Sequence, residues 1–328
     1  MKAVYIKEFG GPENLEIKEV PDPPKPHGEQ VLVRVRAAGL NRADLLQRKG
    51  VYPPPTGYSP NIPGLEFAGE VVEVGNSAAN FSPGDRVMAI TAGEAQAEFV
   101  LIESSLLIPI PSGLPFTDAA AIPEAYITAH DGIFTLGKLK TRQNLLIHAV
   151  GSGVGIAALQ MAKAAGTIVV GTSRTSDKLD RCKELGLDHG IVVANDSAFA
   201  AEVMSLTNGE GASVILDLVG ASYFKDNLAS LAVNGRLILV GLTGGSAAEF
   251  DMRLALQRRA RIIGTVLRPR TVDEKAAATR LFSDHSMGFF VSGAIRPVVD
   301  KVFPADNIRE AHEYLESNKS FGKVVLEF

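Results

Sequence analysis

The stretch Asn144-Leu-Leu-Ile-His-Ala-Val-Gly-Ser-Gly-Val-Gly155 decides the fold of this 328-residue chain. It begins as an apolar run typical of a buried strand, turns through closely spaced glycines, and leads into the alanine-rich segment Val154–Ala165. A strand, a glycine turn and a helix in this order are typical of a dinucleotide-binding turn. Glycine lets a pyrophosphate approach the free backbone N–H groups at the helix start.

The glycines of this turn depart from the usual G-x-G-x-x-G pattern. Gly151 and Gly153 have the first spacing, but Ile156 stands where the last glycine is expected. When the pattern is aligned on Gly155 instead, the earlier slots hold a valine and Ser152. A tight turn in an ordinary βαβ unit would also explain these residues. The nucleotide interpretation predicts that the cofactor binds at Ser152, Gly153 and Val154.

The second strand of this unit favours one nicotinamide cofactor over the other. Residues 167–172 read as a strand, and NAD enzymes carry an Asp or Glu near its end that binds the adenine ribose. This chain has Thr172-Ser173-Arg174 there, with Lys178 one helical turn further on. Hydroxyls and cations suit a ribose 2′-phosphate, so we predict NADPH, bound through Ser173, Arg174 and Lys178. The alternative is a solvated loop at a helix start.

The chain has two textures, which together predict an α/β protein. Residues 1–123 show short alternating strands and proline-rich turns, which indicate a mostly antiparallel β domain. Residues 124–267 alternate strands with helices, which predicts a doubly wound, six-stranded parallel sheet. Residues 268–328 return to β texture after a helix and are expected to complete the first domain. The six predicted strands span 144–149, 167–172, 190–193, 213–218, 236–241 and 261–266.

Composition narrows the class of protein and its partners. The net charge of −4 gives no general attraction to nucleic acid or to anionic membranes. A single cysteine, Cys182, excludes a disulfide framework and fits a reducing compartment. No stretch approaches the length of a membrane span, and the N-terminal residues alternate like a strand. We therefore expect a cytoplasmic protein with no membrane partner.

Several separate motifs give the chain a resemblance to a known family. They are Gly11-Pro-Glu-Asn-Leu15, Gly39-Leu-Asn-Arg-Ala-Asp-Leu45, Pro63-Gly-Leu-Glu-Phe-Ala-Gly69, Gly84-Asp-Arg-Val87, Ala121-Ile-Pro-Glu-Ala125, His148–Gln160 and Gly322-Lys-Val-Val-Leu326. In this order they resemble the medium-chain dehydrogenase/reductases, and more narrowly the zinc-independent quinone oxidoreductases (zeta-crystallin-like). The resemblance implies a GroES-like catalytic domain, a Rossmann domain, a cleft between them and a homodimer.

The positions that bind zinc in other members of the family hold different residues here. Zinc-dependent members carry a catalytic cysteine where Asn41 stands, and a histidine where Leu65 stands. The six histidines form no paired spacing, and Cys182 is the single thiol, whereas zinc needs three or four suitable ligands. We therefore predict that the chain binds no metal.

Without a metal, the chemistry must suit hydride delivery to a quinone or an enone. We expect Asn41, Asp44 and Tyr52 to act in catalysis, with Tyr58 nearby. The resemblance places Asn41 beside the nicotinamide and Tyr52 in the substrate pocket. We expect Tyr52 to orient the carbonyl, and it or water to supply the proton. The competing interpretation makes Asn41 and Asp44 turn or helix-cap residues, and gives Tyr52 a covering role.

Further cofactor contacts follow from the resemblance alone. They are Asn41, Thr128, Gly241, Leu242, Leu267, Arg268, Asn318 and Lys323. Relatives often place a tyrosine after the third Rossmann strand, near the adenine phosphate, whereas this chain has Val192-Val193-Ala194. This departure weakens the prediction of NADPH without reversing it.

The leading hypothesis is an NADPH-dependent quinone oxidoreductase acting on small quinones. An NADPH-dependent alkenal or enone reductase needs the same hydride geometry and stays as an alternative. A second alternative is a non-catalytic, nucleotide-binding or RNA-binding protein of the zeta-crystallin type. The acidic balance and the lack of an aromatic-basic motif disfavour RNA. The arginines at 253, 258, 259 and 261 indicate a solvated helix near the sheet edge.

Overall fold

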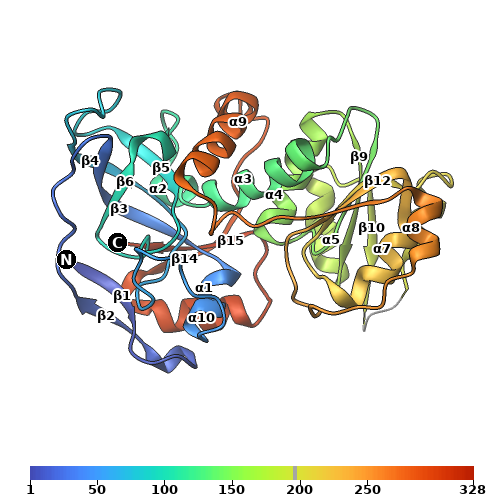
Figure 1. Ribbon diagram of the computed structural model, residues 1–328, viewed down its shortest axis with the longest axis horizontal. Helices are drawn as coiled ribbons and strands as arrows, with labels where there is room; N and C mark the ends of the chain where they lie inside the picture. The colour runs from blue at the N-terminus through green and yellow to red at the C-terminus, as the bar shows by residue number, and fades with distance from the viewer. Residues whose placement is uncertain (195–197) are drawn as a thin grey trace. The chain divides into compact units, whose positions relative to one another are not determined.

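The computed structural model describes residues 1–194 and 198–328, and these form two compact units (Figure 1). Unit 1 comprises Met1–Ile127, Leu267–Val291 and Arg296–Phe328, and unit 2 comprises Thr128–Val266 and Ser292–Ile295. The sequence-based boundaries at 123/124 and 267/268 differ from these by a few residues. As a result, Glu124 and Leu267 lie in unit 1.

Unit 1 is built on a seven-stranded sheet in the order β14-β15-β3-β4-β5-β7, with β6 also paired to β3. Its described pairings are antiparallel apart from β14 with β15. The strands are β3 (Gln30–Leu40), β4 (Glu66–Val74), β5 (Arg86–Ile90), β6 (Phe99–Glu103), β7 (Leu107–Pro109), β14 (Val299–Pro304) and β15 (Lys323–Glu327). A separate pair, β1 (Lys2–Ile6) and β2 (Leu15–Glu19), is also antiparallel. Strand β15 pairs with β3 and brings the end of the chain into this sheet.

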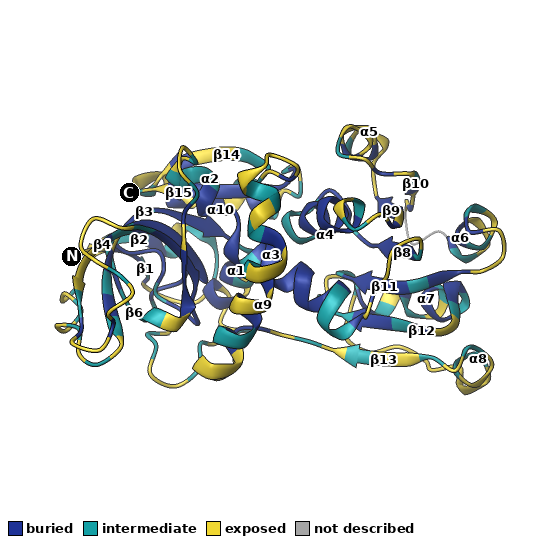
Figure 2. Ribbon diagram, turned by 90° about the horizontal axis from the view of Figure 1, so that it is seen from above, coloured by how far each residue is buried: buried dark blue, intermediate teal, exposed yellow. Residues whose placement is uncertain are grey.

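Period-two alternation explains how β3 packs in unit 1. Val31, Val33 and Val35 are buried and join one hydrophobic core with Phe67 of β4 and Val87 of β5. Side chains two residues apart on a strand point to the same face, so the predicted valine stripe covers this core. Figure 2 shows β3 as a largely buried strand.

The helices of unit 1 are α1 (Arg42–Arg48), α2 (Phe116–Ala119), α9 (Val272–Val291) and α10 (Ile308–Glu316), and α3 (Pro123–His130) continues from unit 1 into unit 2. Short 3-10 turns lie at Pro12–Asn14, Ser104–Leu106 and Ala305–Asn307. Ile308, Ala311 and Leu315 of α10 are spaced at helical intervals, so they share a face that packs on Val4 and Leu326.

Unit 2 is a six-stranded parallel sheet in the order β10-β9-β8-β11-β12-β13. The strands are β8 (Asn144–Ile147), β9 (Ile168–Ser173), β10 (His189–Val192), β11 (Ala212–Asp217), β12 (Leu231–Leu239) and β13 (Arg261–Gly264). The sheet starts at its centre with β8 and grows outward in both directions, which confirms the doubly wound fold and its six predicted strands.

The crossovers of unit 2 are helical. They are α4 (Gly153–Ala164), α5 (Ser176–Glu184), α6 (Ala200–Leu206), α7 (Phe224–Ser230) and α8 (Met252–Arg258), with a π-helical turn at Asp131–Leu136 and a 3-10 turn at Ala221–Tyr223. Helix α4 packs on β8 and β9, and α8 packs on β12. Gly166 follows α4 with a φ of 71°, as expected for a glycine that ends a helix. Within the described residues, no helix is both long and apolar enough to cross a membrane.

Candidate active site

The glycine turn of unit 2 is arranged to receive an anion. Ser152 caps helix α4, and its Oγ accepts a hydrogen bond from the N–H of Gly155 at 3.1 Å. In the described part of the chain, no acceptor lies against the N–H groups of Gly153 and Val154. These two donors and the positive end of the α4 dipole suit a phosphate.

Gly155 explains why the unusual glycine pattern still folds. A Cβ at this position would lie 2.6 Å from the carbonyl oxygen of Ala149 and 2.7 Å from that of Val150. The first turn of α4 therefore packs directly against the end of the preceding strand. Ala149 itself adopts a φ of 48°, in the left-handed region that side chains rarely enter. Gly155 thus fills the packing role of the third glycine in the usual pattern.

The end of β9 brings the predicted 2′-phosphate residues into one short segment. Ser173 is buried, and its Oγ accepts a hydrogen bond from the N–H of Thr175 at 3.3 Å. Arg174 is exposed, and Lys178 lies in the first turn of α5. Asp177 lies beside Lys178, and a hydrogen bond from the Thr175 side chain lowers the pKa of this carboxyl. The segment therefore carries two cations and one carboxylate.

Three more of the predicted cofactor residues lie in unit 2. Thr128 is nearly buried on α3. The N–H of Gly241 donates to the carbonyl of Asp217 at 3.2 Å, and a Cβ there would lie 2.7 Å from the Leu218 carbonyl oxygen. Leu242 is exposed just beyond the end of β12. Gly241 is thus held at the carboxyl edge of the sheet, where nucleotides bind in this fold.

In unit 1, Asn41 and Asp44 form the cap of helix α1. The Asp44 carboxylate accepts hydrogen bonds from the N–H of Asn41 at 2.7 Å and from the N–H of Gly64 at 3.1 Å. Asp44 is buried, and burial raises the pKa of its carboxyl to about 6. The capping interpretation of these two residues therefore describes a real contact. Their catalytic roles stay predictions.

A buried cation lies next to this cap. The Lys323 ammonium donates to the Leu40 carbonyl at 3.0 Å, to Asn41 Oδ1 at 2.6 Å and to Glu66 Oε1 at 2.5 Å. Asn41 Nδ2 also donates to Glu66 Oε1 at 2.9 Å. A Cβ at Gly39 would lie 2.3 Å from the same carboxylate oxygen, so glycine makes room for this ion pair.

The other oxygen of Glu66 ties the cluster to α3. Glu66 Oε2 accepts a hydrogen bond from the N–H of Glu124 at 2.8 Å. Burial, and then the negative charge of Glu66, raise the pKa of the Glu124 carboxyl to about 8. Glu124 therefore carries a proton at neutral pH. The sequence analysis quoted both residues within motifs but assigned neither a role, because they lie 58 residues apart and no local pattern indicates their contact.

Arg268 anchors the loop that contains Tyr52. Its guanidinium donates to the Ala92 carbonyl at 2.8 Å, to the Tyr52 carbonyl at 2.8 Å and to Gln47 Oε1. The guanidinium carbon also lies 4.9 Å from the centre of the Tyr52 ring. Burial raises the pKa of the Tyr52 phenol, and the charge of Arg268 partly opposes that shift. Tyr52 is therefore a neutral O–H donor at physiological pH.

Gln47 extends this anchor and was missed at the sequence level. Its Nε2 donates to the carbonyls of Pro60 at 3.0 Å and of Ile62 at 3.4 Å, so one side chain fixes both Arg268 and the end of the loop. Gln47 lies on α1, three residues after Asp44. The loop that carries Tyr52 and Tyr58 is thus held by buried polar groups rather than by regular structure.

Two of the residues of unit 1 that are predicted to contact the cofactor are cations, and both bind protein groups in this structure. Arg268 and Lys323 are both buried, and their donors are directed at protein oxygens. Asn318 Oδ1 accepts a hydrogen bond from Arg42 at 2.6 Å, and Leu267 is buried. In this structure these side chains therefore support the fold of unit 1, and their contacts with a cofactor stay predictions.

Asn41 and Leu65 stand at the positions that hold zinc ligands in zinc-dependent members of the family, and their contacts here differ from those of zinc ligands. Asn41 Oδ1 accepts a hydrogen bond from the Lys323 ammonium, and Leu65 is buried. Across residues 1–194 and 198–328, no group of three or more His, Cys, Asp or Glu side chains is arranged to hold a metal ion. Cys182 is buried, and burial raises the pKa of its thiol to about 12.

Comparison with known proteins agrees with this architecture. Residues 27–112 match the alcohol dehydrogenase GroES-like domain family, and residues 153–283 match the zinc-binding dehydrogenase family. The chain is 32% identical to a quinone oxidoreductase-like protein 2 homolog of Nematostella vectensis, covering 99% of this chain and 88% of that protein. It is 29% identical to the quinone oxidoreductase of Rattus norvegicus, covering 99% and 97%.

A solved structure gives the same result in three dimensions. A mycobacterial protein crystallised with NADPH superposes with a TM-score of 0.87 at 31% identity, and the match covers 100% of both chains. A GroES-like unit and a doubly wound parallel unit in one chain define an oxidoreductase of the medium-chain dehydrogenase/reductase class. Within that superfamily, the chain belongs to the zinc-independent, quinone oxidoreductase-like group.

Proposed function

We propose that the protein is an NADPH-dependent oxidoreductase that reduces small quinones without a metal. The observation that carries the proposal is the end of β9, where Ser173, Arg174 and Lys178 follow a turn with two available N–H donors. A 2′-phosphate needs cationic and hydroxyl partners, and a pyrophosphate needs backbone donors at a helix start. Quinone oxidoreductase relatives along the whole chain support the choice of acceptor.

In this mechanism, NADPH supplies the hydride when it is bound. The quinone gains the hydride and one proton and becomes a hydroquinone, so two electrons and two hydrogens are balanced. Tyr52 orients the acceptor carbonyl through its phenol O–H, which stays protonated because burial raises its pKa. Either this phenol O–H or a water molecule supplies the single proton. Arg268 holds the Tyr52 backbone in place for this contact.

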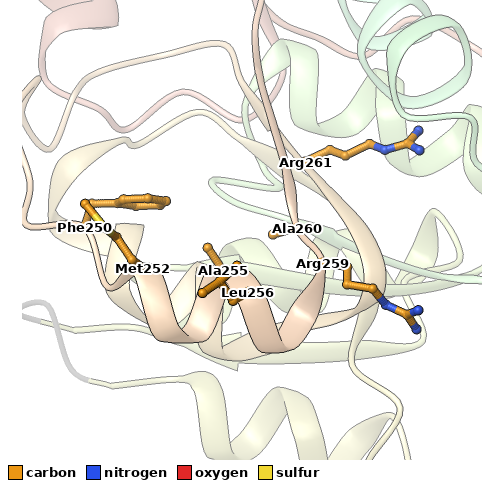
Figure 3. Close-up of a pocket in the computed structure, with 7 residues that line it drawn as sticks. All are labelled: Phe250, Met252, Ala255, Leu256, Arg259, Ala260 and Arg261. Carbon is orange, nitrogen blue, oxygen red and sulfur yellow. The ribbon is translucent and has the colours of Figure 1, made fainter.

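We assign the second copy of a homodimer to the open edge of unit 2. Strand β13 is paired on one side by β12, and neighbouring apolar side chains are exposed: Met252 at 70% and Leu256 at 78%. Figure 2 shows β13 and α8 as exposed elements. Figure 3 shows Phe250, Met252 and Leu256 gathered along α8, where they line a shallow pocket. Sedimentation of wild type and Leu256→Glu tests this, with a dimer expected only for wild type.

The function is tested by following NADPH oxidation with a small quinone and with an α,β-unsaturated ketone in parallel. We expect the quinone to be reduced with the higher kcat/KM. A higher value for the ketone would favour the enone reductase, and no turnover across a broad panel of acceptors would favour the non-catalytic alternative. A cytoplasmic location stays a prediction and does not affect this assay.

A further inference from the structure

His148, in the turn immediately after β8, lies in a hydrogen-bond chain that no sequence motif suggested. The side chain is fully buried. Its Nδ1 lies 2.9 Å from Thr172 Oγ1, and its Nε2 lies 2.6 Å from Asn227 Oδ1. The ring packs against Phe199 and Tyr223, with centroid distances of 5.0 and 4.8 Å. The imidazole is therefore bonded at both nitrogens and packs against two aromatic rings.

The chain of hydrogen bonds ends at Asp217, the last residue of β11. Asn227 Nδ2 donates to Asp217 Oδ2 at 3.0 Å. Asp217 Oδ1 accepts from the N–H groups of Val219 at 2.8 Å and Gly220 at 2.9 Å. Three donors thus converge on one buried carboxylate, which satisfies a group that would be costly to bury alone.

This endpoint fixes the direction of every bond in the chain. Because a carboxylate only accepts, the amide nitrogen of Asn227 faces Asp217 and its oxygen faces His148. That oxygen accepts from Nε2–H, so Nδ1 is the bare nitrogen and accepts from the Thr172 hydroxyl. Burial lowers the pKa of His148, which agrees with this neutral tautomer.

Three members of this hydrogen-bond chain, His148, Thr172 and Asp217, contact or precede segments that are predicted to bind the nucleotide. His148 precedes the turn that holds Ser152, and Thr172 precedes Ser173. The Thr172 carbonyl accepts from the N–H of Val150 at 3.0 Å, which joins β9 to the turn. The Asp217 carbonyl accepts from the N–H of Gly241 at 3.2 Å. The side-chain hydrogen bonds thereby link the segments at the ends of β8, β9 and β11, and this backbone bond joins the segment after β12.

Stability alone does not call for this arrangement. Apolar side chains of similar volume can replace a buried polar network at little or no cost, while a partly broken network is costly. A series of hydrogen bonds with fixed directions instead sets the relative positions of the groups that it joins. The two N–H donors of the turn and the hydroxyl of Ser173 must be at set distances to bind a pyrophosphate and a 2′-phosphate together.

We propose that His148 is a positioning residue that, through Thr172, Asn227 and Asp217, sets the spacing between the pyrophosphate turn and the 2′-phosphate segment. The inference rests on the proposed function, since it assigns this spacing to a nucleotide that carries a 2′-phosphate. Its consequence is a loss of NADPH affinity when a hydrogen bond of the chain is removed, with the chemical step left intact.

Thr172→Val is the sharpest test, because valine is β-branched like threonine and suits a buried strand. It removes the hydroxyl that donates to His148. We expect KM and Kd for NADPH to rise roughly three- to tenfold with kcat nearly unchanged. Thr172→Ser keeps the hydroxyl and is expected to restore most of the affinity. Asn227→Leu, which cuts the chain at its other side, is expected to reproduce the Thr172→Val result.

The outcomes separate this inference from the function on which it rests. Wild type that binds NADPH, together with a folded Thr172→Val variant of equal affinity, would overturn the positioning role. A loss of thermal stability in both Thr172→Val and Asn227→Leu with no change in the Kd for NADPH would also overturn it, since the chain would then serve the fold alone. Wild type that fails to bind NADPH would overturn the proposed function instead.

Discussion

The two units bury polar groups in opposite ways. Unit 1 buries full charges. The Lys323 ammonium lies on Glu66, and its positive charge opposes the rise in pKa that burial causes in the Asp44 and Glu124 carboxyls. In unit 2, the buried Asp217 carboxylate accepts from the neutral amide of Asn227, which in turn is bonded to the neutral imidazole of His148. The ionic cluster should therefore respond strongly to removal of a charge and to pH. The neutral chain should respond chiefly in ligand affinity.

The largest expected effect breaks the ionic cluster of unit 1. Lys323→Met leaves the buried Glu66 carboxylate without its cation, which should lower the free energy of unfolding by about 3–5 kcal/mol. Denaturant unfolding measures this loss. Adding Glu66→Gln should recover most of the stability, while Lys319→Met, at an exposed position, serves as the matched control. A Lys323→Met variant as stable as wild type would show that the ion pair between Lys323 and Glu66 does not stabilise the folded state.

Substitution of Arg268 distinguishes its role as an anchor of the Tyr52 loop from a role as a cofactor contact. Arg268→Met removes the bonds to Tyr52 and Ala92, so the acceptor kcat/KM should fall about tenfold as the loop loses its position. The Kd for NADPH, measured by fluorescence titration, should change by less than about twofold. A large rise in that Kd would restore the cofactor contact predicted from the family resemblance. Arg280→Met on the exposed face of α9 is the control.

Lys178 tests the cofactor preference of unit 2. In Lys178→Ala the ratio of kcat/KM for NADPH to that for NADH should fall about fivefold, because one of two cations near the 2′-phosphate is lost. Lys183→Ala on the same helix, where Lys183 pairs with Asp180 at 2.9 Å, should leave the ratio unchanged. Equal use of both cofactors by wild type would end the preference for NADPH.

The raised pKa of Glu124 predicts a pH dependence of stability in unit 1. The folded protein keeps a proton on this carboxyl up to a pKa of about 8, whereas the ordinary pKa is 4.5. The folded state therefore binds more protons than the unfolded state between these values, and stability falls as pH rises through that window. Glu124→Gln does not titrate, so its stability should gain on that of wild type as the pH rises from 5 to 8, by up to about 3–4 kcal/mol for a shift of this size.

Urea unfolding of both proteins at matched pH values measures this difference. The raised pKa of Asp44 gives both proteins a pH dependence in the same direction. An equal difference at every pH would contradict a protonated Glu124. Glu310→Gln, at an exposed position of α10, controls for the loss of a surface charge.

Local patterns were enough to predict much of the fold. The six strands of unit 2 were found because apolar runs and glycine turns act over a few residues, and Gly166 marked the end of α4. The ion pair of Glu66 and Lys323 joins positions 257 residues apart, so no local period shows it. The sequence does not distinguish His148 from other histidines, because its partners Thr172 and Asn227 come next to it only in the folded sheet.

The candidate site was predicted with uneven success for the same reason. Ser152 follows from the turn itself, whereas the role of Arg268 depends on a loop that regular periodicity does not describe. Asn41 and Asp44 gave a readable helix-start signal, and the structure confirms their cap contact. A buried polar residue at the end of an apolar run, such as His148, is the signal that would have pointed to the chain in unit 2.

The central claim is hydride transfer from NADPH to a quinone without a metal. The most direct measurement is kcat/KM for a small quinone with NADPH deuterated at the transferred position, after exhaustive chelation of metals. We expect undiminished turnover and a primary isotope effect on kcat/KM. Loss of activity on chelation, restored by added zinc, would contradict it.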